Sequence, residues 1–268
     1  MRTFIYFVLS LQKLQRLNLS FNPLGDGASY PLTCCLNHMT ALQGLQIESC
    51  DLTDRFLDGH VSPSLKRRKL EEIRFGFNDF SLSAIKSWME ILDFTTLKNL
   101  SLRGLSSERL VSTLCTNIQS VEQCQLMEID LSHCNLTDCC VEQLAITFEH
   151  TPNLKKLVLK NNMQLGIDSL AELLSSLQLK NVNIEELDLL GCVLTRSNSK
   201  DSGRCVENLR SLLSWSKSLR HLRLSFSRKN GDPTWIPSLT DVWITCHERG
   251  VIAKQLTEYQ LVLTTSSS

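Results

Sequence analysis

The sequence predicts an α/β solenoid in which a short strand and a helix alternate along the chain. Three observations carry this prediction: one leucine-rich motif recurs at a nearly constant period, its leucines alternate as in a strand, and the residues between copies follow helical spacing. A length of 268 residues usually means one or two globular domains. A solenoid escapes that estimate, because each repeat buries its apolar face against its neighbours.

The motif has the form LxxLxLxxNxL, with Cys at the Asn place in some copies. Copies begin at Leu14, Leu42, Leu70, Leu97, Leu126, Leu154, Ile184 and Leu219, and the copy at Leu97 is degraded. The steps between their starts are 28, 28, 27, 29, 28, 30 and 35 residues. This period is typical of leucine-rich repeats with a full helix in each unit. We therefore predict a horseshoe of about eight repeats, with parallel strands on the concave side and helices on the convex side.

The L-x-L segment of each copy predicts a short strand, because alternate side chains of a strand point to opposite faces. Leu17 and Leu19, for example, then face the core. The Asn or Cys three places later lies where the chain turns away from the sheet, and its side chain can satisfy backbone groups that the turn leaves unpaired. These structural turn positions are Asn22, Cys50, Asn78, Cys134, Asn162 and Cys192.

The second half of each repeat predicts a helix. Leu170, Leu173, Leu174 and Leu177 follow the spacing i, i+3, i+4 and i+7, which places them on one helical face. Asp168 or Ser169 is the expected N-cap of this helix. Similar apolar faces are formed by Ala84, Ile85, Trp88, Ile91 and Leu92, and by Val141, Leu144, Ala145 and Phe148.

We expect two regions, a repeat domain over residues 1–229 and an irregular C-terminal cap or tail over 230–268. The pattern ends after Phe226, and Ile236, Leu239, Val242 and Trp243 are candidates to cover the last apolar face. The polar stretch 195–203 is expected to be a surface loop. The apolar stretch 4–9 lacks a small-x-small cleavage site, so we interpret it as a worn first strand or a truncated start rather than a signal peptide.

Charge and cysteine usage exclude several classes of function. Lys plus Arg and Asp plus Glu each total 28, so no overall charge draws the chain to nucleic acid. No apolar run approaches the roughly 20 residues that span a bilayer. The 11 cysteines include no CxxC pair and form no disulfide framework, which favours free thiols in a reducing compartment.

Catalytic and metal motifs are missing from the sequence, so we predict no enzyme activity, no cofactor and no metal. The best zinc candidate is the cluster His133, Cys134, Cys139 and Cys140. Cys134 already has the turn role, however, and adjacent residues of a helix point about 100° apart. We therefore interpret the cluster as structural.

The strand residues between the leucines predict a binding surface, because a leucine-rich repeat presents them as a rigid array. The predicted partner-binding residues are Arg16, Asn18, Glu48, Glu72, Arg74, Arg103, Glu128, Asp130, Lys156, Lys160, Glu186, Asp188 and Arg223. Their mixed charge suits a protein partner better than nucleic acid. The dense basic run Lys66-Arg67-Arg68-Lys69 follows Pro63 and should face solvent; it is either an ordinary solvated loop or a nuclear-import signal.

Three stretches narrow the choice among repeat families. They are LNLSFNPLGDG at Leu17–Gly27, DSLAELLSSLQ at Asp168–Gln178 and LDLLGCVL at Leu187–Leu194. In order and spacing they resemble the C-terminal leucine-rich repeats of the Tonsoku-like family, over roughly residues 14–225. The ending WIPSLTDVWITCHERG is unlike that family.

The resemblance implies a nuclear protein of replication-fork and recombination repair, whose repeats hold a large protein partner at damaged forks. In that family tetratricopeptide, ankyrin and ubiquitin-like regions precede the repeats, and the ankyrin part reads histones, so no residue of this chain is expected to contact histones. Two alternatives stay open. One is a cytosolic ribonuclease-inhibitor-like module, such as the ligand-sensing end of an innate immune receptor, and the other is a Ran-type GTPase regulator.

Overall fold

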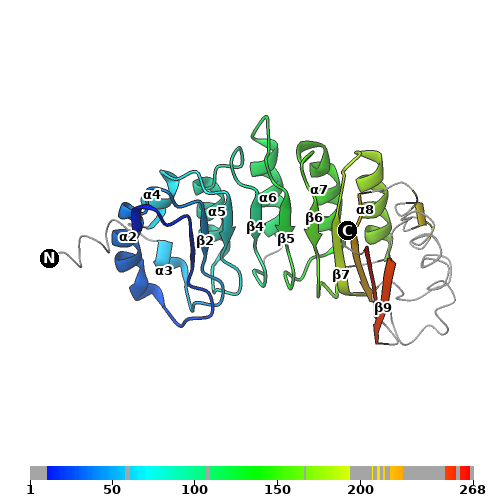
Figure 1. Cartoon of the computed structure of the whole chain (residues 1–268), viewed down its shortest axis with the longest axis horizontal. Helices are drawn as coiled ribbons and strands as arrows, with labels where there is room; N and C mark the ends of the chain where they lie inside the picture. The colour runs from blue at the N-terminus through cyan, green and yellow to red at the C-terminus, as the bar shows by residue number, and fades with distance from the viewer. Residues whose placement is uncertain are drawn as a thin grey trace. The chain divides into compact units, whose positions relative to one another are not determined.

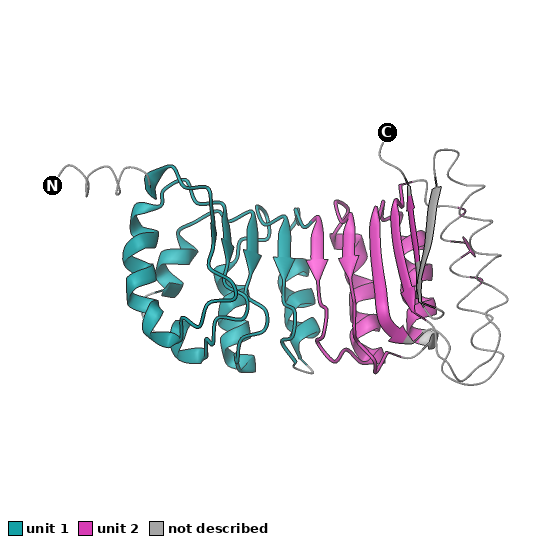
Figure 2. Ribbon diagram, turned by 60° about the horizontal axis from the view of Figure 1, so that its bottom comes forward, with its two compact units in different colours: residues 1–126 teal, residues 127–268 magenta. Residues whose placement is uncertain are grey.

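The computed structural model describes residues 11–57, 61–106, 109–165, 167–193, 207, 210–211, 214, 218–225, 251–257 and 260–265. The chain folds into two compact units, Met1–Leu126 and Met127–Ser268 (Figure 2). The stretches 4–9 and 195–203 and the residues Ile236, Leu239, Val242 and Trp243 lie outside the described residues. The division into a repeat domain and a cap at residue 229 stays a prediction.

A strand forms at the L-x-L segment of every copy of the motif (Figure 1). The first unit holds β1 (Arg16–Asn18), β2 (Gly44–Gln46), β3 (Glu72–Arg74) and β4 (Asn99–Ser101). The second holds β5 (Glu128–Asp130), β6 (Lys156–Val158), β7 (Glu186–Val193) and β8 (His221–Ser225). Within each unit successive strands pair in parallel, so the predicted α/β class with a parallel sheet is confirmed.

The register of the sheet keeps equivalent motif positions side by side. In the first unit Leu45 pairs with Ile73, and Ile73 pairs with Leu100. All three side chains are fully or almost fully buried. Equivalent positions of successive copies are paired in the sheet, so the apolar residues at one motif position lie side by side in the core.

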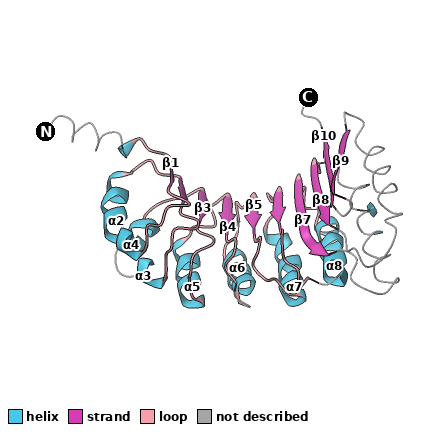
Figure 3. Cartoon of the chain, turned by 90° about the horizontal axis from the view of Figure 1, so that it is seen from below, coloured by secondary structure: helices cyan, strands magenta, loops and turns pink. Residues whose placement is uncertain are grey.

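Helices lie on one side of the strands in each unit (Figure 3). The first unit has η1 (Asp26–Ala28), α2 (Ser29–His38), α3 (Asp54–Leu57), α4 (Val61–Lys66), α5 (Leu82–Ile91) and α6 (Leu110–Gln119). The second has α7 (Asp138–Thr147), η2 (Phe148–His150) and α8 (Ile167–Leu179). The predicted apolar face of α8 is buried at Leu170, Leu173, Leu174 and Leu177.

Three details of the helices differ from the expectation. Because α8 begins at Ile167, Asp168 and Ser169 lie inside the helix, and the predicted N-cap is wrong. On α5, by contrast, Ser81 is an N-cap that the pattern did not single out, since its Oγ accepts a hydrogen bond from the Ala84 N–H at 3.4 Å. Ile91 is only half-buried, whereas Met89, absent from the predicted face, is fully buried.

The end of the second unit is more regular than the sequence suggested. Strands β9 (Val251–Thr257) and β10 (Gln260–Thr265) pair antiparallel, and β10 also pairs antiparallel with β8. Both lie in the range expected to be an irregular cap or tail, so that description is corrected for these segments. The buried Leu263 of β10 lies opposite Leu222, which means that β10 covers the edge of β8.

No helix among the residues that the structure describes is long and apolar enough to cross a bilayer.

Candidate binding surface on the sheet

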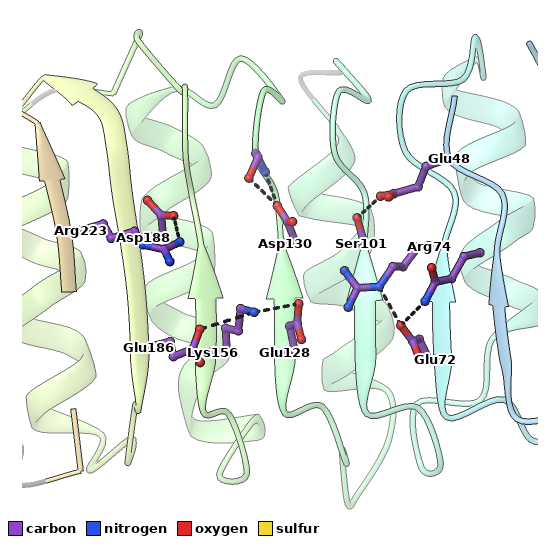
Figure 4. A network of polar contacts seen from close by, with 12 residues as sticks. Glu48, Glu72, Arg74, Ser101, Glu128, Asp130, Lys156, Glu186, Asp188 and Arg223 are labelled. Atoms are coloured by element: carbon purple, nitrogen blue, oxygen red, sulfur yellow. Dashed lines mark hydrogen bonds and ion pairs between the residues drawn. The ribbon is translucent and has the colours of Figure 1, made fainter. Parts of the chain in front are cut away.

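Side chains of the predicted binding surface lie along the strands and meet their neighbours from adjacent repeats (Figure 4). They divide into two classes. Four carboxylates are buried, each with 6% or 7% of its surface exposed: Glu48, Glu72, Asp130 and Asp188. All four are among the predicted partner-binding residues. Three of them, Glu48, Glu72 and Asp188, bond to side chains of other repeats, and one copy of the motif does not show such contacts.

In the first unit, Glu72 is the centre of a charged cluster. Its Oε1 accepts hydrogen bonds from Arg74 Nε at 2.7 Å and Gln46 Nε2 at 2.9 Å. Arg16 Nε approaches Oε2 at 3.9 Å, a weaker contact because the Arg16 side chain is 75% exposed. Two arginines and an amide from three adjacent strands therefore share one buried carboxylate.

The second buried carboxylate of this unit, Glu48, bridges repeats that are not neighbours in sequence. Its Oε1 accepts a hydrogen bond from Ser101 Oγ at 2.6 Å, while its backbone N–H donates to Ser20 Oγ at 3.1 Å. The glutamate is thereby satisfied inside the unit. Burying a carboxylate without such partners would be costly.

The second unit also links neighbouring strands by charge pairs, but here a cation lies at the centre. Lys156 Nζ lies 3.6 Å from Glu128 Oε1 and 3.5 Å from Glu186 Oε2, so one cation bridges the carboxylates of the strands on both sides. Asp188 Oδ2 accepts a hydrogen bond from Arg223 Nη1 at 3.0 Å.

Asp130 is held within its own repeat. Its Oδ1 accepts hydrogen bonds from Ser132 N at 2.9 Å and Ser132 Oγ at 2.5 Å. A side chain held by two bonds keeps one orientation, so Asp130 contributes a fixed negative charge beneath the surface.

The remaining predicted residues are accessible to a partner to different degrees. Arg16, Asn18 and Arg223 are exposed, whereas Arg74, Arg103, Glu128, Lys156, Lys160 and Glu186 are half-buried. In the first unit the accessible charged residues are all arginines, because its acids Glu48 and Glu72 are buried, whereas the accessible residues of the second unit carry both charges. Whether these residues contact a partner stays a prediction.

The turn positions form hydrogen bonds between repeats. Asn162 is fully buried; its Nδ2 donates to Leu131 O and Leu159 O, and its Oδ1 accepts from the backbone N–H of Cys134 and of Leu136. Asn78 makes the equivalent bonds, accepting from Cys50 N at 2.9 Å and Leu52 N at 3.2 Å. Each of these asparagines thus satisfies a turn of the preceding repeat as well as its own.

The cysteine turn positions use a smaller set of contacts. Cys50 Sγ lies 3.2 Å from Leu19 O, and Cys192 Sγ lies 3.0 Å from Leu159 O. Burial raises the pKa of the Cys192 thiol to about 11, so this side chain stays a neutral donor near pH 7. Asn22, at the first turn, is exposed and donates to Leu19 O and Ser20 O.

Two exposed aromatic rings were missed by the sequence reasoning. Phe21 and Phe77 directly precede the turn asparagines and have φ angles of 62° and 53°, in the left-handed region that bulky residues seldom adopt. The two residues are 75% and 39% exposed. The guanidinium of Arg103 lies 5.3 Å from the centre of the Phe77 ring, a cation–π contact. The dipeptide Phe-Asn, which the first and third copies share, could have pointed to these two rings.

The fourth copy of the motif is degraded after Arg103, where it carries Gly104. The φ of Gly104 is +69°, and a Cβ there would lie 2.2 Å from Cδ1 of Phe77. Only glycine fits beside that ring.

The four residues of the zinc candidate do not share one environment in the fold. Cys134 and Cys140 are buried, whereas His133 and Cys139 are exposed. His133 Nε2 lies 2.9 Å from Asn161 Nδ2 of the next repeat. Among the described residues no three His, Cys, Asp or Glu side chains come together as a metal site, and the nine described cysteines are free thiols.

The basic run is partly built into the fold. Lys66 ends α4, and Lys66, Arg67 and Lys69 are exposed, but Arg68 is half-buried. Both terminal nitrogens of Arg68 donate to backbone carbonyls near the end of α2, those of Leu36 and Met39. The expectation that the whole run faces solvent is therefore wrong at Arg68.

The chain is similar to several known proteins with leucine-rich repeats. No family model matches it. It is similar to a Tonsoku-like protein of Mus musculus, with 29% identity over 190 residues, or 68% of this chain and 14% of that protein. It is also similar to NACHT, LRR and PYD domains-containing protein 14 of Homo sapiens, at 29% identity over 80% of this chain and 22% of the relative.

A third relative is the ribonuclease inhibitor of Mus musculus, which is 29% identical over 70% of this chain and 35% of its own length. The predicted resemblance to Tonsoku-like protein is confirmed. The chain spans a small part of each of these relatives, 14% of the first.

Proposed function

We propose that this chain is a non-enzymatic protein-binding module that binds its partner through the polar strand residues described above. The observation that carries the proposal is the set of lateral contacts on that surface. Glu72 orients Arg74, and Lys156 stands between Glu128 and Glu186, so charged groups are fixed before a partner arrives. A pre-ordered surface loses less side-chain entropy on binding, and its charge pattern selects the partner.

We further propose that the module acts in the nucleus, in replication-fork and homologous-recombination repair. The similarity to Tonsoku-like protein favours this role over others. The partner would be a protein of a replication-repair complex. Histones are expected to contact other regions of such a protein, because the family's histone-reading part is an ankyrin region.

The test uses a charge-reversed surface variant and a matched control. The surface variant combines Arg16→Glu, Lys160→Glu and Glu186→Lys, which avoids the buried Asp130 and Asp188. The control combines Arg55→Glu, Lys86→Glu and Glu142→Lys, three exposed residues of α3, α5 and α7. Both variants change the net charge equally, so a difference between them reports position rather than total charge.

Each tagged chain is isolated from nuclei after replication is blocked, and co-purified fork-repair proteins are quantified by mass spectrometry. We expect the surface variant to lose them about tenfold, which corresponds to about 1.4 kcal/mol of binding free energy, and the control to retain them. The proposal fails if the unmodified chain recovers no fork-repair protein, or if both variants recover as much as the unmodified chain does.

The similarity to ribonuclease inhibitor and to a NACHT-containing protein favours a second candidate, a cytosolic inhibitor or sensor module. Hydrolysis of RNA by a pancreatic-type ribonuclease, with and without the chain, separates the two. Inhibition that the surface variant loses and the control keeps would support the second candidate.

A further inference from the structure

The segments that lead into β2 and β3 line an open cavity of about 500 Å³ in the first unit. Residues 40–43 form one side, and residues 67–69 form the other. The cavity lies at the start of these strands, and its lining includes none of the predicted surface residues. Its volume falls within the roughly 300–1,000 Å³ of known ligand pockets.

Three cations, Arg67, Arg68 and Lys69, line this cavity, and no carboxylate does. The two acids that follow in sequence are engaged elsewhere. Glu71 pairs with Lys98 at 3.0 Å, and Glu72 accepts a hydrogen bond from Arg74 at 2.7 Å. Within the part of the chain that the structure describes, Arg67 and Lys69 have no acidic partner. In a chain with no net charge, this is a local and uncompensated positive field.

The walls of the cavity are anchored to the fold. Arg68 binds the carbonyls of Leu36 and Met39 with its terminal nitrogens, and its Nε is buried without a hydrogen-bond partner among the described residues. On the other side, Thr40 Oγ1 donates to Gln12 O at 3.3 Å. The backbone at Arg67 and Lys69 is therefore held in place by Arg68. In an unanchored loop, repulsion between the like charges would move these side chains apart.

We propose that this cavity binds an oxyanion presented by a protein partner, either the phosphate of a phosphorylated side chain or the carboxylate of Glu or Asp. Arg67 and Lys69 would supply charge-assisted hydrogen bonds, and Gln43, which also lines the cavity, has a side-chain amide that can donate another. No aromatic residue lines the cavity, so the bases of a single-stranded nucleic acid would find no stacking platform there. A peptide fits these features better.

The site is tested on the full chain with three labelled glycine–serine peptides that differ at one position: phosphoserine, glutamate or serine. Fluorescence anisotropy measures their dissociation constants. We expect the phosphoserine peptide to bind most tightly, the glutamate peptide less tightly and the serine peptide least. Added salt should weaken binding of the two anionic peptides, because the contacts are charged and near solvent.

The variant Arg67→Glu with Lys69→Glu should weaken phosphopeptide binding at least about tenfold, or about 1.4 kcal/mol. The control Arg55→Glu with Lys86→Glu reverses two exposed cations outside the cavity and should change it less than about twofold. Arg68 is left unchanged because it holds α2. Far-ultraviolet circular dichroism and thermal unfolding of both variants show whether the fold is intact.

Equal losses in the two variants would overturn the proposal, since they would report net charge alone. So would equal affinity for the phosphoserine and serine peptides, or tighter binding of a single-stranded oligonucleotide than of the phosphopeptide. The sheet-surface variant should bind the phosphopeptide normally, which keeps a failure of this site distinct from a failure of the proposed function.

Discussion

Asn162 forms four hydrogen bonds from a fully buried position, two to carbonyls and two from backbone N–H groups of the preceding repeat. A buried backbone group that loses its partner costs about 1–3 kcal/mol, and water does not reach this site easily. Asn162 and Asn78 therefore stabilise the turn of the preceding repeat as well as the turn of their own.

We expect Asn162→Ala to lower the free energy of unfolding by about 3 kcal/mol or more, because it leaves several buried groups without partners. Asn22→Ala is the matched control. Its amide donates to two carbonyls at an exposed turn, where water can replace it, so the loss should stay below about 1 kcal/mol. Urea unfolding measures both, and losses of the same size would contradict the account of Asn162.

Cys192 gives the stability a dependence on alkaline pH. Burial raises the pKa of its thiol to about 11, against about 8.5 for a thiol in an unfolded chain. The folded state thus holds the proton more tightly. Its contribution is complete below about pH 8.5 and is lost as the pH rises towards 11, at no more than about 1.4 kcal/mol per pH unit.

The measurement is the free energy of unfolding at several pH values between 8 and 11, for the unmodified chain and Cys192→Ala. The variant should be less stable near neutral pH, since a small buried group is lost, but its stability should fall less steeply with pH. Parallel curves would show that Cys192 does not titrate as its burial requires.

At the scale of the element, α5 is held against its repeat by aromatic stacking. The rings of Phe75 and Trp88 lie 4.6 Å apart with an interplanar angle of 14°, and Phe80 meets both edge-on at 6.1 Å. Trp88 is fully buried, yet among the described residues its indole Nε1 has no hydrogen-bond partner. The indole thus contributes apolar contact and at the same time carries the cost of an unmet donor.

Trp88→Ala and Trp88→Phe should therefore lower the free energy of unfolding by amounts that differ more than the volumes of the two side chains suggest. The alanine variant leaves a large cavity and should cost about 3–5 kcal/mol. The phenylalanine variant loses volume but also removes the unpaired N–H, so we expect less than about 1.5 kcal/mol. Chemical denaturation compares the two, and a phenylalanine variant as unstable as the alanine variant would mean that the indole N–H is satisfied in solution.

The elements also show where sequence reasoning succeeded. The repeat strands were predicted to within a residue or two, except β7, which continues four residues past its L-x-L segment; L-x-L fixes both the period of a strand and its buried face. The second repeat was harder, since its helical half forms two short helices, α3 and α4, with Pro63 in the first turn of α4. Strands β9 and β10 pair antiparallel and lie outside the repeat pattern, so the period could not predict them.

At the scale of the whole molecule, periodicity predicts what every copy shares and misses what neighbouring copies do together. The buried rows and turn positions belong to the first kind. The burial of Glu48 and Glu72 belongs to the second, because their hydrogen-bond partners Ser101 and Gln46 lie in other repeats. The fold of Arg68 onto α2 was hidden for the same reason, as its partners lie 29 and 32 residues away.

The hydrogen bonds of the turn asparagines also bear on the order in which repeats are completed during synthesis. The backbone N–H of Cys134 is satisfied by Asn162, and that of Cys50 by Asn78, in each case 28 residues downstream. A ribosome releases the chain from its N-terminus, so each of these turns emerges before the side chain that completes it. The hydrogen bonding of such a repeat can therefore be completed only after the turn asparagine of the next repeat has been translated.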